Sequence, residues 1–323
     1  MGCCQAKTDR ADLQVYDRPP INTRSGYQLQ EDLHDSRLDQ SELDPIEDHI
    51  PSPDYALPTP TLPKISNTQI RSTLLELGNY EYKEEQSAEN KALPYFEPFL
   101  LLADGAIYMG QWKYGFRHGR GICVWTDGVQ YEGYWQDDRP DGQGRKIFQD
   151  GSYYIGSWVN GSEHGPGMYR GKDFTYEGEW YEGKPHGIGK KKISKDVYYE
   201  GAFYMGVKKG KGKQVDIDGS IYEGNFDNDN PEGQGRCVYL DGSVYEGLWK
   251  DGLRHGKGVF KSKEGTYNGE WAFDKKHGYG VMEWAEGRRY EGQWQNDVMH
   301  GKGKLKERGG KVTEGQWENG TLV

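Results

Sequence analysis

The sequence of 323 residues is short of the features on which globular and membrane-spanning proteins depend. Hydrophobic residues make up only 34% of it, which is low for a thick, two-layered core. The longest uninterrupted apolar run covers residues 99–103, whereas a helix that crosses a bilayer needs about 20 apolar residues. We therefore expect neither a membrane-spanning helix nor a secretory leader.

Cysteine and net charge in the repeated part are scarce too. The four cysteines, at positions 3, 4, 123 and 237, show no metal-ligand spacing and are too few for a disulfide scaffold, so we expect a reducing cytoplasm. Residues 1–92 hold 17 acidic and 9 basic side chains, and the remaining chain holds 34 and 32. Because nucleic-acid binding needs a strongly basic surface, the near-neutral remainder excludes a nucleic-acid partner.

What the sequence has instead is a repeat built from glycine, tyrosine and tryptophan. Residues 176–189 read YEGEWYEGKPHGIG, and close copies recur every 22 or 23 residues. Each copy has an aromatic residue, a glycine two positions later and a second aromatic two positions after that. The first aromatics are Tyr108, Tyr131, Tyr154, Tyr176, Tyr199, Tyr222, Tyr245, Tyr267 and Tyr290, with Thr313 in the tenth place; the second are Trp112, Trp135, Trp158, Trp180, Phe203, Phe226, Trp249, Trp271, Trp294 and Trp317.

This spacing predicts a β-hairpin for each repeat. Side chains two residues apart lie on one face of a strand, so the Tyr, Gly and Trp share a face and the polar residues between them face water. Asp-Gly pairs such as Asp127-Gly128 and Asp241-Gly242 indicate tight turns between strands. We expect an all-β fold: an elongated, twisted, single-layer antiparallel sheet in which a ring from a neighbouring strand covers each bare glycine.

The pattern Tyr-x-Gly-x-Trp, a short turn and His-Gly-x-Gly resembles the membrane occupation and recognition nexus (MORN) repeat family. The resemblance covers residues 108–322, in nine full copies and a truncated tenth. Phe203 and Phe226 replace Trp, Pro140-Asp141 and Pro231-Glu232 alter the turn, and Lys209 replaces His. The resemblance implies a protein of membrane junctions, cell cortex, basal complexes or cilia, often dimeric. Kinase and exchange-factor domains often accompany these repeats, but this sequence contains neither.

Four segments follow from the composition. Residues 1–65, with the Pro-rich run PSPDYALPTPTLP, are expected to be a disordered tether. Residues 66–92 hold a short helix that starts after Asn67, stops at Gly78 and docks on the ribbon or on a partner. Residues 93–107 form a degenerate capping half-repeat, and residues 108–323 form the repeat domain. Its incomplete last repeat leaves a strand edge, so a homodimer is one hypothesis.

The opening residues MGCC suggest a lipid anchor. Gly2 could accept myristate once Met1 is removed, and Cys3 and Cys4 could accept palmitate, although Ala6 stands where the myristoylation pattern prefers Ser or Thr. One myristoyl chain binds a membrane only marginally, so stable attachment needs the second acyl group. The alternative is a terminus with two unmodified thiols.

Two groups of repeat residues are candidates for contacts with other molecules. An aromatic interaction surface would consist of Tyr108, Trp112, Tyr131, Trp135, Tyr154, Trp158, Tyr176, Trp180, Tyr245, Trp249, Tyr267, Trp271, Tyr290 and Trp294. A basic patch that contacts anionic phospholipid headgroups would consist of Lys190, Lys191, Lys192, Lys208, Lys209, Lys211 and Lys213. Charged edges more often serve solubility.

No catalytic, cofactor or metal site stands out from the repeat pattern. Six histidines occupy one repeat slot and lie at least a repeat apart, so we expect a structural role rather than a metal site: His118, His164, His186, His255, His277 and His300. The acidic residues 227–233 lack the glycine and glutamate of a calcium-binding loop. Gly-x-Gly recurs without the Lys-Ser/Thr of a phosphate loop.

The sequence therefore predicts a non-enzymatic scaffold, tethered by acyl chains to the cytoplasmic face of a plasma or ciliary membrane or at the cell cortex. It would present the ribbon to a protein partner. The alternatives are a phosphoinositide-binding module, a soluble cytoskeletal or ciliary structural element, and a ribbon that recruits an enzyme through a peptide along its aromatic groove.

Overall fold

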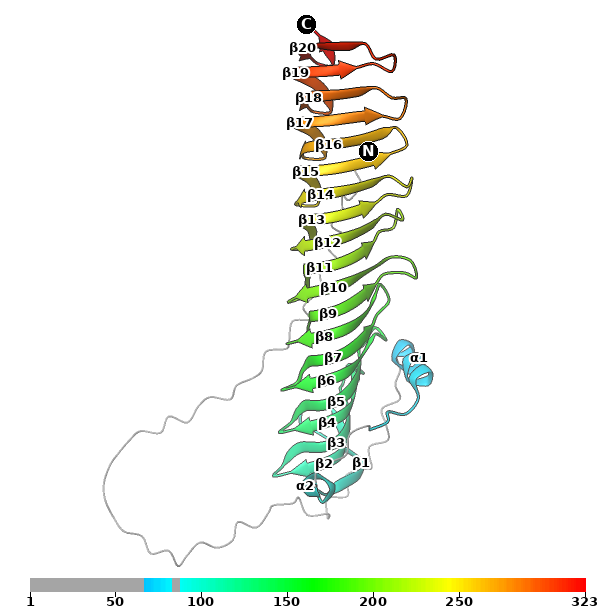
Figure 1. Cartoon of the computed structure of the whole chain (residues 1–323). Helices are drawn as coiled ribbons and strands as arrows, with labels where there is room; N and C mark the ends of the chain where they lie inside the picture. The colour runs from blue at the N-terminus through cyan, green and yellow to red at the C-terminus, as the bar shows by residue number, and fades with distance from the viewer. Residues whose placement is uncertain (1–66, 83–87) are drawn as a thin grey trace, which may run out of the picture. The chain divides into compact units, whose positions relative to one another are not determined.

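A computed structural model describes residues 67–82 and 88–323 of the chain (Figure 1). It contains two helices, α1 (Thr68–Leu77) and α2 (Ala88–Lys91), and one antiparallel sheet. The strands are β1 (Tyr95–Leu101), β2 (Ile107–Lys113), β3 (Phe116–Val124), β4 (Gln130–Gln136), β5 (Arg139–Ile147), β6 (Tyr153–Val159), β7 (Ser162–Arg170), β8 (Thr175–Tyr181), β9 (Lys184–Lys192), β10 (Tyr198–Tyr204), β11 (Val207–Val215), β12 (Ile221–Asp227), β13 (Asn230–Val238), β14 (Val244–Lys250), β15 (Leu253–Ser262), β16 (Gly265–Ala272), β17 (Lys275–Trp284), β18 (Arg289–Gln295), β19 (Val298–Lys306), β20 (Val312–Glu318) and β21 (Thr321–Leu322). The predicted tether, residues 1–65, lies outside the described part.

The sheet is a simple meander in a single layer. Every strand pairs antiparallel with the next strand along the chain, from β1 with β2 to β20 with β21. Figure 1 displays the strands as one twisted column in chain order. The predicted all-β, single-layer sheet of tandem hairpins is confirmed.

The His-Gly-x-Gly motif bends each hairpin. In the first repeat Gly110 pairs with Gly121 and Trp112 pairs with Arg117, so one residue of β2 faces three residues of β3. The two extra residues of β3 make a bulge, and Gly119 within it has φ +64°, a left-handed conformation that suits glycine. The same register shift recurs in each hairpin as far as β18 and β19.

Two kinds of turn alternate along the chain. Within a hairpin, dipeptides such as Asn160-Gly161 have positive φ at both residues, as in a type I′ turn. Between hairpins, the predicted Asp-Gly turns form three-residue loops: Gly128 donates its backbone N–H to the carbonyl of Trp125, and the Asp127 carboxylate accepts from the backbone N–H of Val129. The type I′ geometry therefore lies at the opposite end of the hairpin from the Asp-Gly pairs.

The segments before the first repeat cap the sheet. Strand β1 pairs with β2, and Gly105 donates to the carbonyl of Leu102, as the Asp-Gly turns do elsewhere. Helix α1 begins after Asn67, whose side chain accepts hydrogen bonds from the backbone N–H groups of Gln69 and Ile70, and it ends at Gly78. The predicted helix, its N-cap and its docking on the ribbon are confirmed.

Candidate interaction surfaces

The face of the sheet that carries Tyr, Gly and Trp, here called the aromatic face, holds a continuous ladder of rings. Each ladder tyrosine meets the large aromatic of its own repeat and that of the next repeat edge to face, with ring centroids 4.9 to 5.5 Å apart. Phe203 and Phe226 stand in the ladder without a gap, each between two tyrosines. Such pairs add about 0.5 to 1.5 kcal/mol each beyond area burial, so the ladder stabilises every junction between repeats.

The bare glycines exist because a tyrosine ring lies over them. A Cβ on Gly133 would come within 2.5 Å of both the Tyr131 hydroxyl and the Cα of Gly144, and a Cβ on Gly144 would overlap the same ring. The covering ring thus comes from the same strand as Gly133, two residues before it. The prediction that a neighbouring strand supplies the ring over this glycine is wrong, because the Tyr131 ring runs along its own strand, past Gly133, to the carbonyl of Tyr134.

Hydrogen bonds fix both kinds of ring. Tyr131 donates its hydroxyl to the carbonyl of Tyr134 over 2.9 Å, and Trp135 donates its indole N–H to the carbonyl of Gly121 over 3.1 Å. The tyrosine bond recurs in all nine repeats, and the indole bond recurs at later ladder tryptophans. Trp112, at the start of the ladder, has a buried indole nitrogen without a partner among the described residues. The indole N–H of a ladder tryptophan thus finds its hydrogen-bond acceptor in the preceding repeat.

The fourteen aromatic residues assigned to an interaction surface are core residues. All are buried except Trp112, which is half-buried, and Tyr108, Tyr131, Tyr176, Tyr245 and Tyr290 are 0% exposed. A partner on the aromatic face would therefore meet the atoms around these rings rather than the rings. Their role in partner binding stays a prediction.

An arginine contact that joins adjacent repeats, here called the clasp, was not predicted from the sequence. Arg254 stacks on Trp271 at 4.4 Å and bonds to Asp274 of the next repeat through its backbone N–H and its guanidinium. Arg117 makes the same contacts with Trp135 and Asp138. The sequence carries a signal for this contact. Where Arg or Lys occupies the position of Arg254 in a repeat, the type I′ turn of the next repeat ends in Asp instead of Gly. The four pairs are Arg117 and Asp138, Lys208 and Asp229, Arg254 and Asp274, and Lys276 and Asp297.

The seven lysines of the predicted headgroup patch do not share one face. Lys191 lies beside Tyr199 on the aromatic face and over the Phe174 ring, where burial lowers its pKa. Lys190 and Lys213 lie on the opposite face, here called the back face, in ion pairs of 2.5 and 2.7 Å with Glu200 and Glu223. Lys208 is half-buried over the rings of Tyr199 and Phe226, and Lys209 pairs with Asp227. Lys192 and Lys211 are exposed on the back face. Headgroup binding stays a prediction, and Lys192 and Lys211 are the exposed lysines best placed for it.

The repeat histidines pack against aromatic side chains near the type I′ turns. His164 and His186 flank Tyr181 with ring centroids 5.0 and 5.5 Å away. Within residues 67–82 and 88–323 no group of three His, Cys, Asp or Glu side chains could hold a metal ion.

Burial raises the pKa of the Cys123 thiol to about 11. In the part of the chain that the structure describes, neither helix has the length and apolar character to span a bilayer. Gly2, Cys3 and Cys4 lie outside the described residues.

The back face is covered by the chain itself over β5 to β7. Ile70 of α1 is fully buried against Ile147 and Tyr153. The Thr73 hydroxyl donates to the carbonyl of Gly151 over 2.8 Å, and the Asn67 side chain donates to Gln149 in the same turn. These contacts seat the first half of the helix.

A buried ion pair anchors the end of the helix. The Arg145 guanidinium donates two hydrogen bonds of 3.0 Å to the carbonyl of Gly78, which follows α1, and it pairs with Glu132. Tyr82 then packs edge to face on Tyr134, and Arg120 stacks over Tyr82. Residues 67–82 thus cover the early repeats on the back face.

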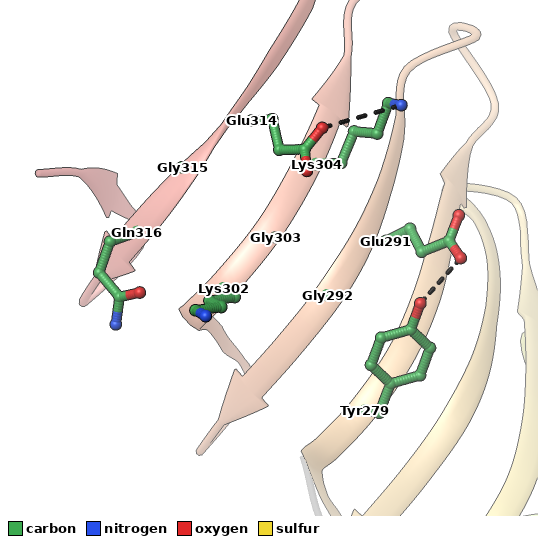
Figure 2. Close-up of a pocket in the computed structure, with 9 residues that line it drawn as sticks. All are labelled: Tyr279, Glu291, Gly292, Lys302, Gly303, Lys304, Glu314, Gly315 and Gln316. Atoms are coloured by element: carbon green, nitrogen blue, oxygen red, sulfur yellow. Dashed lines mark hydrogen bonds and ion pairs between the residues drawn. The ribbon is translucent and has the colours of Figure 1, made fainter.

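A shallow hollow of 740 Å³ opens on the back face of β17 to β20 (Figure 2). Tyr279 donates its hydroxyl to Glu291 over 2.8 Å, and Lys304 lies 3.9 Å from Glu314. Figure 2 also places Lys302 and Gln316 at its rim. The hollow is polar and carries mixed charge, so it offers hydrogen bonds to an extended chain and no cluster of one sign for an anion.

Comparison with known proteins gives one family. The MORN repeat model matches residues 108–130, 131–153, 154–175, 176–194, 199–221, 222–244, 245–266, 267–287 and 290–306. A comparison with curated proteins gives no match. Among solved structures, the chain is similar to the TCP10 domain of CPAP from Danio rerio, with 12% identity, a TM-score of 0.32 and coverage of 68% of this chain and 100% of that one.

Two further solved structures are similar at lower scores. The SAS-4 (dCPAP) TCP domain of Drosophila melanogaster, solved with a proline-rich motif of Ana2 (dSTIL), is 9% identical with a TM-score of 0.21 and covers 74% of this chain and 99% of that one. A streptogramin B lyase is 9% identical with a TM-score of 0.14 and covers 68% and 82%.

Proposed function

Because the chain belongs to the MORN repeat family, with nine tandem repeats over residues 108–306, we propose that it is a non-catalytic scaffold held at the cytoplasmic face of a membrane. Acyl chains on Gly2 and on Cys3 or Cys4 provide the tether, and the ribbon binds a protein partner. The observation that carries the proposal is the unbroken aromatic ladder from Trp112 to Trp317. It makes one long sheet whose back face is free to vary from repeat to repeat.

The back face supports protein binding better than lipid binding. Its lysines alternate with glutamates and form ion pairs such as Lys190 with Glu200 and Lys213 with Glu223. A surface of alternating charge favours a partner with complementary charges over a uniformly anionic membrane. The direct phosphoinositide-binding module is thus the second candidate, and the soluble cytoskeletal element is the third.

Membrane flotation of the full-length protein from its native cells tests the tether. The wild-type protein should float with membranes and carry acyl adducts on its first four residues by intact mass. The Gly2→Ala variant and the Cys3→Ser/Cys4→Ser variant should both become soluble, because one acyl chain gives only marginal binding. A Gly2→Ala protein that still floats would favour the phosphoinositide candidate, and unmodified wild-type protein that pellets with the cytoskeleton would favour the third.

A further inference from the structure

Three cross-strand pairs of apolar residues on the back face lie beside an Asp-Gly-Ser turn. The pair Val215 and Ile221, across β11 and β12, has Lys213 in an ion pair with Glu223 where the other two places have an arginine.

At the first of the two places with an arginine, Ile147 and Tyr153 pair across β5 and β6, and Ile70 of α1 is buried against them. At the second place Val238 and Val244 pair in the same way across β13 and β14. Both valines are only partly buried, whereas Ile147 and Tyr153 are 1% and 5% exposed. The second pair therefore presents apolar surface where the first pair meets a helix.

The turn beside each pair has the same geometry. At the first place the turn ends in Gly151, with φ +82°, and its carbonyl accepts the hydrogen bond from Thr73. At the second place the turn ends in Gly242, with φ +80°, after the same Asp and before the same Ser. The Gly242 carbonyl thus occupies the position that, at the first place, receives a helix hydroxyl.

The charged residues around the two pairs match as well. Arg145, which donates twice to the carbonyl that ends α1, corresponds to Arg236, and Arg236 is exposed. Arg170, which pairs with Glu76 of α1 at 3.2 Å, corresponds to Lys261, also exposed. Both cations therefore stand where they can hold the carboxyl-terminal end of a helix, which carries free carbonyls and negative partial charge.

Among these residues, one differs in chemical character, and this difference predicts how the two bound helices differ. Ile155, which packs in the apolar cluster under α1, corresponds to the exposed Glu246. A helix bound at the second place thus needs a basic residue opposite Glu246 where α1 offers an apolar one.

We propose that Val238 and Val244, with Arg236, Gly242 and Lys261, form a second helix-docking site that binds an amphipathic helix of a partner protein. The helix has apolar residues at spacings of four and three, an acidic residue in its last turn for Lys261 and a basic residue for Glu246. This inference rests on the scaffold function proposed above and names where on the ribbon a partner docks. The occupant is a protein helix because the same surface four repeats earlier holds one.

A labelled peptide of residues 66–82 is a suitable probe, because it contains the helix that the first place binds. Fluorescence anisotropy with the full-length protein should give saturable binding. Val244→Arg should weaken binding at least tenfold, and Glu246→Ile, which restores the residue of the first place, should tighten it at least threefold. Val312→Arg, at the same strand position three repeats later, should leave the affinity within twofold. A peptide with Ile70→Arg should not bind.

Hydrogen exchange on the same mixtures locates the peptide. Protection should appear over β13 to β15 in the wild-type protein and be lost in Val244→Arg, whose folding is checked by its thermal unfolding. No binding, binding that is insensitive to Val244→Arg and Glu246→Ile, or protection confined to β5 to β7 would overturn the proposal. A wild-type dimer that Val244→Arg makes monomeric would overturn the partner helix in favour of α1 from a second copy. A ribbon that fails these tests and still floats with membranes in an acyl-dependent way would lose the docking site and keep its tether.

Discussion

The early and later repeats share one face of the sheet and differ on the other. On the aromatic face, Tyr131 and Tyr222 both sit between two large rings with almost the same geometry. On the back face, Arg145 is 3% exposed beneath residues 67–82, whereas its counterpart Arg236 is exposed. The difference indicates that the aromatic face holds the repeats together, whereas the exposure of the back face changes from repeat to repeat.

The largest expected effect comes from ionising the ladder tyrosines, because this disrupts the aromatic face of every repeat at once. Burial raises the pKa of the ladder tyrosines, to about 12 for Tyr199 and Tyr290, against 10.0 for a free phenol. The neutral phenol is the buried form, so this stabilisation is complete below pH 10 and is lost as the pH rises from 10 to 12. Circular dichroism should record an unchanged melting temperature from pH 7 to 9 and a cooperative loss of the sheet above pH 10. A melting temperature that stays constant to pH 12 would contradict the ladder.

Truncation of single ladder tyrosines tests whether the early and the later repeats depend equally on the aromatic ladder. Tyr131→Ala and Tyr222→Ala should each lower the free energy of unfolding by about 3 to 5 kcal/mol, the usual cost of removing a large buried aromatic. Urea unfolding measures both. If the cover of residues 67–82 made the early repeats independent of the ladder, only Tyr222→Ala would be costly.

The counterpart arginines should respond differently. Arg145→Met leaves Glu132 buried without its cation and should cost about 3 kcal/mol. Arg236→Met changes an exposed side chain and should cost less than about 0.5 kcal/mol. Equal losses in urea unfolding would mean that the back face of the later repeats is also covered.

The smallest effect concerns the clasp between repeats. Asp274→Gly removes the acceptor for the Arg254 backbone and side chain and should cost about 1 kcal/mol. Arg254→Pro with Asp274→Gly copies the combination found at Pro231 and Gly252, so the double variant should lose less than the sum of the single variants. Additive losses would show that the two residues are not coupled.

The sequence predicts the shared face well because periodicity alone determines it. Tyr, Gly and Trp at spacings of two must share a strand face, and Asp-Gly pairs must turn. Asn67 and Gly78 likewise mark the ends of α1, because capping depends on local residues. All of these features depend on neighbours in the sequence.

The features that were missed depend on contacts across strands. The source of the ring over Gly133 depends on the bulge, whose register no single strand specifies. The burial of rings such as Trp158 in a single-layer sheet depends on the interlocking of successive bent hairpins. The sequence does show that Ile147 and Tyr153 interrupt the polar pattern at adjacent back-face positions. Val238 and Val244 do the same, so the pattern alone does not tell which pair α1 covers.

Hydrogen exchange on the Ile70→Arg variant tests most directly whether the aromatic face holds the repeats together independently of the back face. With α1 displaced, exchange should become faster in α1 and in the turn that contains Gly151, which accepts from Thr73. Strands β8 to β20 should keep wild-type protection, because their ladder is intact. Faster exchange throughout β8 to β20 would contradict the account, since the docked helix and not the aromatic ladder would then hold the repeats together.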